Sequence, residues 1–144
     1  LHEALQPQFK EYQAQVIHNC AVMADTLAQE GFRIVSGGSD NHLCLVDVKG
    51  YIGMSGKQAE QLLDEVGITC NKNTIPFDSE KPFVTSGIRL GSAAMTTRGF
   101  KEEQFRQVAH WIAEVCKHPD EVDKEKIHEA VIALCRQFPL PNEQ

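Results

Sequence analysis

Several features that mark particular classes of protein are missing from this sequence. The 14 basic residues form no run, and the formal net charge at pH 7 is −6. A nucleic-acid backbone is bound by clustered basic side chains, so this balance argues against a nucleic-acid partner. No window approaches the roughly 20 apolar residues that span a bilayer, and the opening residues lack the apolar core of a signal peptide. We therefore expect a cytoplasmic protein without a membrane segment, whose partners are small molecules or other proteins.

Clustered metal ligands are also missing. The cysteines include no C-x-x-C pair, and the histidines include no H-x-x-x-H pair. The 5 cysteines cannot all pair within one chain, so we expect reduced thiols that pack as small hydrophobic residues. The alternative is a reactive or metal-binding thiol. Because no Cys/His group has the spacing of a zinc site, we predict no metal site.

The sequence does contain an ordinary hydrophobic fraction and clear periodic patterns. Of its 144 residues 42% are hydrophobic, which predicts one domain spanning 1–144. Apolar or aromatic residues recur every three or four positions from Leu5 to Leu27. This spacing predicts a long amphipathic helix, which Gly31 ends by taking a left-handed conformation.

Short strands and a second helix are predicted next. Segments 32–35 and 42–48 have the composition of strands and flank a turn-forming stretch, so we expect them to pair antiparallel. Ser55 followed by Gln58 is a capping box, which predicts that a helix begins there. A third strand is expected at 68–70.

The second half begins with an irregular segment and then becomes helical. Segment 71–84 is rich in Asn, Asp and Pro, which predicts a long ordered loop, and such loops tend to be functional. Segment 87–91 returns to the sheet. Helices are predicted at 102–118, with acidic residues in the first turn and basic residues in the last, and around 127–138. The pattern predicts an α+β fold in which helices cover a short, mostly antiparallel sheet.

Arg89 is the residue that stands out, because it lies between two glycines in an otherwise apolar strand. Strand alternation directs Ile88 toward the core and Arg89 away from the helix-covered side. A guanidinium on a rigid strand suits bidentate capture of a carboxylate, and Gly87 and Gly91 would let another group approach the backbone. The alternative is an arginine that pairs with a surface Glu or caps the sheet edge. Spacing alone leaves both interpretations open.

Three long strings carry a resemblance to a known family. They are "SGGSDNHLCLVDV", "ITCNKNTIPFDSEKPFVTSGIRLG" and "TTRGF", in this order and with these separations. The chain resembles the C-terminal region of bacterial serine hydroxymethyltransferase, a pyridoxal-phosphate enzyme that interconverts serine and glycine using tetrahydrofolate. Only Ser39 and Ser92 depart from the usual pattern, and both keep the hydroxyl of the family's Thr. The resemblance implies the small C-terminal domain of a fold-type I transferase, working as a homodimer.

The resemblance also implies roles for particular residues. The family arginine that binds the carboxylate of serine or glycine corresponds to Arg89. Asn73 matches a position that contacts the pteridine of the folate, and Lys81, Pro82 and Phe83 match the segment that lines this site. Lys81 is the variable member of that segment, and a backbone contact is the alternative there.

No catalytic residue is expected in this chain. The family's Schiff-base lysine lies in a large N-terminal domain that the chain does not contain, and Lys72 has no apolar surroundings that would fit it for imine chemistry. We assign Asp40 and His42 to turn and strand-start structure, because neighbours on one turn cannot converge as a hydrolytic triad. We therefore expect that the chain alone cannot turn over serine.

Two other classes of function stay open on the sequence. The chain could be a stand-alone ligand-binding or interaction domain derived from this family. It could also be a purely structural domain, in which case neither glycine nor a folate would perturb its spectra.

Overall fold

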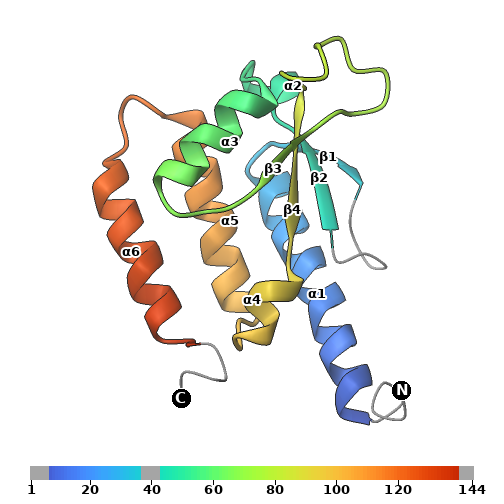
Figure 1. The fold of residues 1–144 in the computed structure, drawn as a ribbon, viewed down its shortest axis with the longest axis vertical. Helices are drawn as coiled ribbons and strands as arrows, with labels where there is room; N and C mark the ends of the chain where they lie inside the picture. The colour runs from blue at the N-terminus through green and yellow to red at the C-terminus, as the bar shows by residue number, and fades with distance from the viewer. Residues whose placement is uncertain (1–6, 37–42, 140–144) are drawn as a thin grey trace.

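The protein folds into a layer of helices packed on one face of a small sheet. The computed structural model describes residues 7–36 and 43–139. In chain order the elements are α1 (Pro7–Gln29), β1 (Arg33–Ser36), β2 (Leu43–Asp47), α2 (Lys49–Ile52), α3 (Gly56–Glu65), β3 (Asn71–Asn73), β4 (Gly87–Gly91), α4 (Ala93–Thr97), α5 (Glu102–Lys117) and α6 (Lys124–Arg136). Figure 1 shows α6 at the outer edge beside α5, and the loop between β3 and β4 projecting beyond the sheet. The predicted α+β fold is confirmed.

The described strands form one sheet in the order β1-β2-β4-β3, and every neighbouring pair is antiparallel. The predicted antiparallel pairing of the first two strands is confirmed, with a register irregularity between Ile34 and Ser36. β4 lies inside the sheet, because β2 and β3 pair with its two sides. The backbone at the middle of β4 is therefore paired with a strand on each side.

The predictions for the first and second long helices are confirmed, including the signals at their ends. Ser55 and Gln58 form the capping box at the start of α3, where the amide of Gln58 donates to Ser55 Oγ over 3.2 Å. α1 ends at Gly31, whose φ is 103°, and the amide of Phe32 donates to the carbonyl of Leu27 over 3.0 Å. This is the Schellman arrangement, in which a left-handed residue lets the chain turn back on the helix end.

The third strand was predicted in the wrong place. It comprises Asn71–Asn73, whereas the apolar residues Ile68 and Cys70 had indicated a strand at 68–70. The reason is that the amide of Ile68 donates to the carbonyl of Leu63 over 2.9 Å and closes the end of α3. Ile68 and Cys70 are buried in the core, but their backbone belongs to the helix end and the connection.

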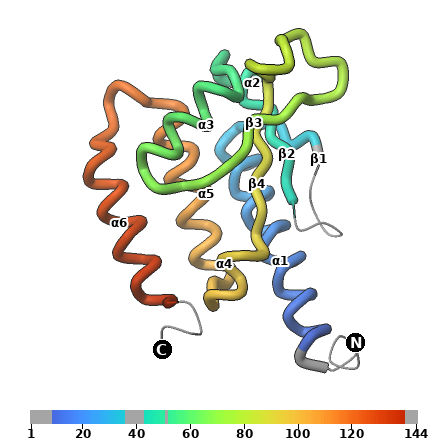
Figure 2. The backbone as a smooth tube through the Cα atoms, in the orientation of Figure 1, coloured from blue at the N-terminus to red at the C-terminus, as the bar shows by residue number. Residues whose placement is uncertain are grey.

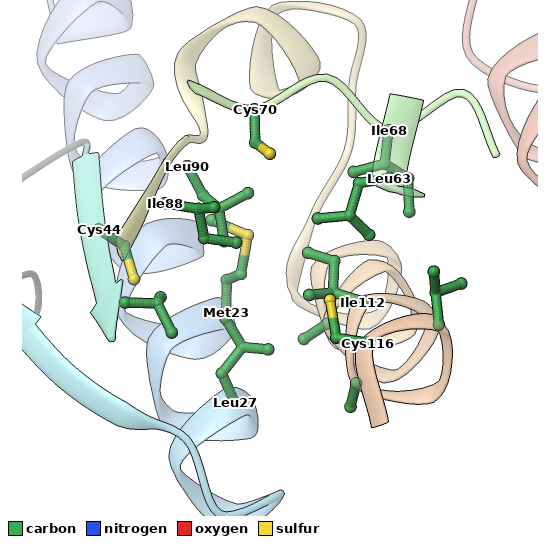
Figure 3. Packing of buried hydrophobic residues seen from close by; sticks show 14 of the residues in the cluster. Met23, Leu27, Cys44, Leu63, Ile68, Cys70, Ile88, Leu90, Ile112 and Cys116 are labelled. Atoms are coloured by element: carbon green, nitrogen blue, oxygen red, sulfur yellow. The ribbon is translucent and has the colours of Figure 1, made fainter. Parts of the chain in front are cut away.

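The core lies between the helices and the covered face of the sheet. Figure 3 shows Met23 and Leu27 of α1 facing Ile88 of β4 in this core. Of the described cysteines, four are buried, and burial raises the pKa of Cys44 and of Cys116 to about 12. Such thiols are inert at neutral pH, which supports their interpretation as small hydrophobic residues.

The short helices α2 and α4 were not predicted. α4 belongs to a polar junction around the "TTRGF" string, in which the buried amide of Asn19 donates to Thr96 Oγ1 and to the carbonyl of Phe100, both over 3.0 Å. Arg98 of the same string donates from Nε to the carbonyl of Phe138 over 2.6 Å and from Nη2 to that of Cys135 over 2.9 Å. The string therefore joins α1 and the end of α6 to the core.

Some predictions fall outside the described residues. These are the start of the first helix at Leu5, all but the first residue of the turn at 36–41, the start of the second strand at His42, and the structural roles of Asp40 and His42. Among the helices that are described, none is long and apolar enough to cross a membrane.

Candidate functional site

Arg89 occupies the centre of β4, with Leu45 of β2 and Asn71 of β3 directly opposite it. Its strand neighbours Ile88 and Leu90 are buried in the core, whereas Arg89 is exposed. The predicted orientation is confirmed: the guanidinium lies on the face of the sheet that the helices leave uncovered. The backbone beneath it is fixed by hydrogen bonds to both neighbouring strands.

The guanidinium of Arg89 makes no hydrogen bond or ion pair with any residue in 7–36 or 43–139. Within the described residues, Arg89 therefore does not pair with a surface Glu. It does not cap a sheet edge either, because β4 lies inside the sheet. The outer face has another arginine, Arg33, but it is bound to Asp47 over 3.0 Å. Within the described segments, Arg89 thus differs from Arg33 in having no carboxylate partner.

Two asparagines share the open face with Arg89. Asn71 is directly opposite Arg89 and Asn73 is opposite Gly87, so both alternate onto the same side of the sheet. Side chains directly opposite in an antiparallel pair are about 5 Å apart at Cβ, and diagonal neighbours about 7 Å. The amide nitrogen of Asn73 donates to the carbonyl of Thr74 over 2.8 Å. The centre of the face thus combines one cation with two amides.

Asn71 was missed by the sequence analysis. The signal was present, because residues two apart on a strand share a face and the string "NKN" contains two asparagines at that spacing. A segment predicted as a loop has no regular alternation of side chains, so the loop prediction for 71–84 does not place Asn71 on a face.

The structure does not bring all the predicted folate residues to this face. Lys81, Pro82 and Phe83 are exposed in the loop that follows β3, and Phe83 is 80% exposed. Lys72 Nζ lies 5.6 Å from the centre of the Phe83 ring. Lys72 is opposite Ile88, so alternation places it on the other side of the sheet from Arg89. Of the folate set, Asn73 shares the face of Arg89, whereas Phe83 lies near Lys72.

Gly87 does not serve an incoming ligand as expected. The space next to Gly87 is occupied by other atoms of this chain. A Cβ atom at Gly87 would lie 2.8 Å from Ile75 Cγ2 and 2.9 Å from the carbonyl oxygen of Asn73. The small residue is needed because the start of the loop packs against β4. Gly91, by contrast, is exposed.

Asp78 holds the loop in shape. Its carboxylate accepts hydrogen bonds from the amides of Ile75, Glu80 and Ser86 and, over 2.6 Å, from the hydroxyl of Ser86. Partial removal from water would raise the pKa of Asp78, but the hydrogen bonds from Ser86 and Ile75 outweigh it and lower the pKa. The ionised form of Asp78 therefore fixes both ends of the loop that carries Phe83.

We predict that Asp78→Asn loosens this loop without unfolding the protein. Because the folded-state pKa is lowered, the stabilisation by Asp78 is complete above its unfolded pKa, about 4, and is lost as pH falls through the lower folded value. At pH 7 the amide of Ser86 should exchange with solvent faster in Asp78→Asn than in the wild type. When the two proteins are compared at the same pH, the difference between their rates should shrink in acid. Equal exchange rates at pH 7 would contradict the role of Asp78.

The fold and the face together define a class: an α+β protein whose open sheet surface carries a guanidinium beside two amides. Comparison with known families identifies the family to which this protein belongs. The model of the family described as serine hydroxymethyltransferase matches residues 1–112. The chain belongs to the serine hydroxymethyltransferase family, a family of transferases. The match ends within α5, so α6 lies outside it.

The described residues do not fit pyridoxal phosphate as a covalent partner. An imine-forming lysine is normally desolvated, yet none of the lysines in the described segments is buried. Lys49 is paired with Glu80, and Lys72 rests against the exposed ring of Phe83. Those segments also contain no group of three His, Cys, Asp or Glu side chains placed to hold a metal ion.

Proposed function

We propose that this chain forms the substrate-carboxylate contact, and part of the folate contact, of a serine hydroxymethyltransferase. The reaction would interconvert serine and tetrahydrofolate with glycine and 5,10-methylenetetrahydrofolate. Family membership supports the class of reaction. The observation that carries the proposal is the guanidinium of Arg89 on an inner strand of the open face, where no residue in 7–36 or 43–139 pairs with it.

Arg89 would bind the amino-acid carboxylate through two parallel N–H···O bonds. A planar fork on an inner strand restricts rotation of the bound carboxylate, and hence of the α-carbon attached to it. Asn71 is close enough to donate a further hydrogen bond to the same ligand. These residues orient the substrate; pyridoxal phosphate, which would supply the electron sink, would be held by a domain outside this chain.

The folate would approach from the loop side. Asn73 is the last residue of β3, two residues along the strand from Asn71, and the loop begins directly after it. The Asn73 amide can hydrogen-bond the polar edge of a pteridine, and the exposed ring of Phe83, which lies in the following loop near Lys72, offers a separate apolar surface. Lys81 and Pro82 form the turn that presents this ring, in which the carbonyl of Lys81 accepts from the amides of Val84 and Thr85, each over 2.9 Å.

A titration with folinic acid tests the folate assignment on the chain itself. We expect the Asn73 side-chain amide and the Phe83 ring signals to shift in NMR spectra in a saturable manner, with the substitution Asn73→Ala weakening binding several-fold. The matched control is Gln107→Ala, which removes an amide from an exposed position on α5 and should leave binding unchanged. Shifts spread over the chain, or equal binding by both variants, would count against the assignment.

A further inference from the structure

A second candidate site lies beneath α6, away from the open face. A cavity of about 360 Å³ is enclosed by α1, β4, α4, α5, α6 and the segment 67–69. Figures 1 and 2 show that α6 approaches the rest of the molecule from the outer edge, beside α5. Met23 and Leu90, which Figure 3 shows side by side in the core, contribute the inner wall, and Val131 and Leu134 of α6 contribute the outer one.

The lining is apolar almost throughout. Of the lining residues, Thr69 is the one with a polar uncharged hydroxyl, and none carries a formal charge. A charged ligand would lose its hydration here and find no partner, which is costly. A cavity with this lining favours apolar molecules, and its volume of about 360 Å³ lies within the range of small-molecule sites, about 300 to 1,000 Å³.

The lining also favours rings over alkyl chains. The thioethers of Met23 and Met95 and the rings of Phe100, Phe105 and Trp111 all border the space. Sulfur and aromatic groups make favourable contacts with the edges and faces of an added ring. A flexible aliphatic chain would gain less from these partners and would lose more conformational freedom on entry.

The space is held open by attachments at both ends of α6. At the C-terminal end, Arg98 donates to the carbonyls of Phe138 and Cys135, and the Phe138 ring meets Phe100 edge-on with 5.1 Å between centroids. At the N-terminal end, Lys124 Nζ forms an ion pair with Glu65 Oε2 of α3 over 3.0 Å. Fixed at both ends, the helix cannot simply settle inward to fill the cavity.

We propose that this cavity is a binding site for a neutral aromatic molecule of one or two rings. Arg89, Asn71 and Asn73 are not among the lining residues, so the site is distinct from the carboxylate face, although Gly91 at the end of β4 borders the cavity. It does not depend on the proposed transferase function, and its outer wall is the helix that lies outside the family match.

The three methionines of the chain provide a direct test with an internal control. Met23 and Met95 line the cavity, whereas Met54 does not. In the chain labelled with 13C-methyl methionine, added p-xylene is expected to shift the signals of Met23 and Met95 saturably, with a dissociation constant of about 1 mM or below, and to leave Met54 unchanged. Benzoate, a similar ring with a charge, is expected to bind at least about tenfold more weakly.

A matched pair of variants locates the binding. Ala94 lines the cavity and Ala133 lies exposed on α6 outside it. Ala94→Phe should occupy the mouth and reduce p-xylene binding at least about tenfold, whereas Ala133→Phe should bind as the wild type does. Equal shifts at all three methionines, shifts that do not saturate, or undiminished binding by Ala94→Phe would each overturn the proposal. The wild-type titration decides the matter even if Ala94→Phe fails to fold.

Discussion

Arg89→Lys in the full-length enzyme is expected to weaken serine binding about 10- to 100-fold while leaving cofactor binding nearly intact. Lysine keeps the positive charge but offers a point donor in place of the planar fork, so one of two charge-assisted hydrogen bonds is lost. Such bonds contribute about 1.5 to 3 kcal/mol each, and each 1.4 kcal/mol is a factor of about ten in affinity. The measurement is the KM for serine together with the affinity for pyridoxal phosphate.

The control for this prediction is Arg106→Lys, the same change at an exposed position on α5. It should alter neither serine binding nor stability. Because Arg89 is exposed and has no partner among the described residues, Arg89→Lys should also leave the urea midpoint unchanged, which separates a binding role from a structural one. Unaltered serine affinity in Arg89→Lys would refute the carboxylate assignment.

The sequence predicted some parts of the fold better than others, depending on the kind of signal. Signals that act locally were reliable: the capping box at Ser55 and the left-handed Gly31 are satisfied within a few residues, and both helix ends lie where predicted. The prediction of the third strand was wrong because residues 68–70 are apolar, as in a buried strand, but their backbone forms the end of α3 and the connection after it. Ile68 donates to the end of α3, and nothing in a short apolar string distinguishes a strand from a buried helix end.

The candidate site shows the same division. The outward direction of Arg89 follows from alternation about the buried Ile88, which requires only that 87–91 is a strand. That β4 lies between β2 and β3 could not be predicted, because strand order is set by which surfaces the helices bury together. The placement of Phe83 against Lys72 depends on the path of a long loop, and loop paths are fixed by individual bonds such as those of Asp78.

The loop depends in turn on Gly56, which leads to the second large effect. The amides of Gly56 and Lys57, at the start of α3, donate to the carbonyls of Thr85 and Val84, each over 3.0 Å. These bonds satisfy helix-end donors that would otherwise lack partners. Thr85 is buried with φ at 58°, an uncommon conformation for a residue with a side chain, so the neighbouring backbone has little freedom to adjust.

Gly56→Ala is therefore expected to destabilise the protein by about 3 kcal/mol, since overpacking a closed site forces backbone shifts. The added methyl group would overlap Thr85 Oγ1 and the carbonyl of Gly87, and both are held in place by a bond between them of 3.1 Å. Gly53→Ala is the matched control, because Gly53 has φ at 74° but no atom within 4 Å of the added methyl group. It should cost only the conformational penalty of about 1 kcal/mol. Urea unfolding followed by the emission of the single tryptophan, Trp111, measures both, and equal losses would show that crowding at the loop anchor is not the cause.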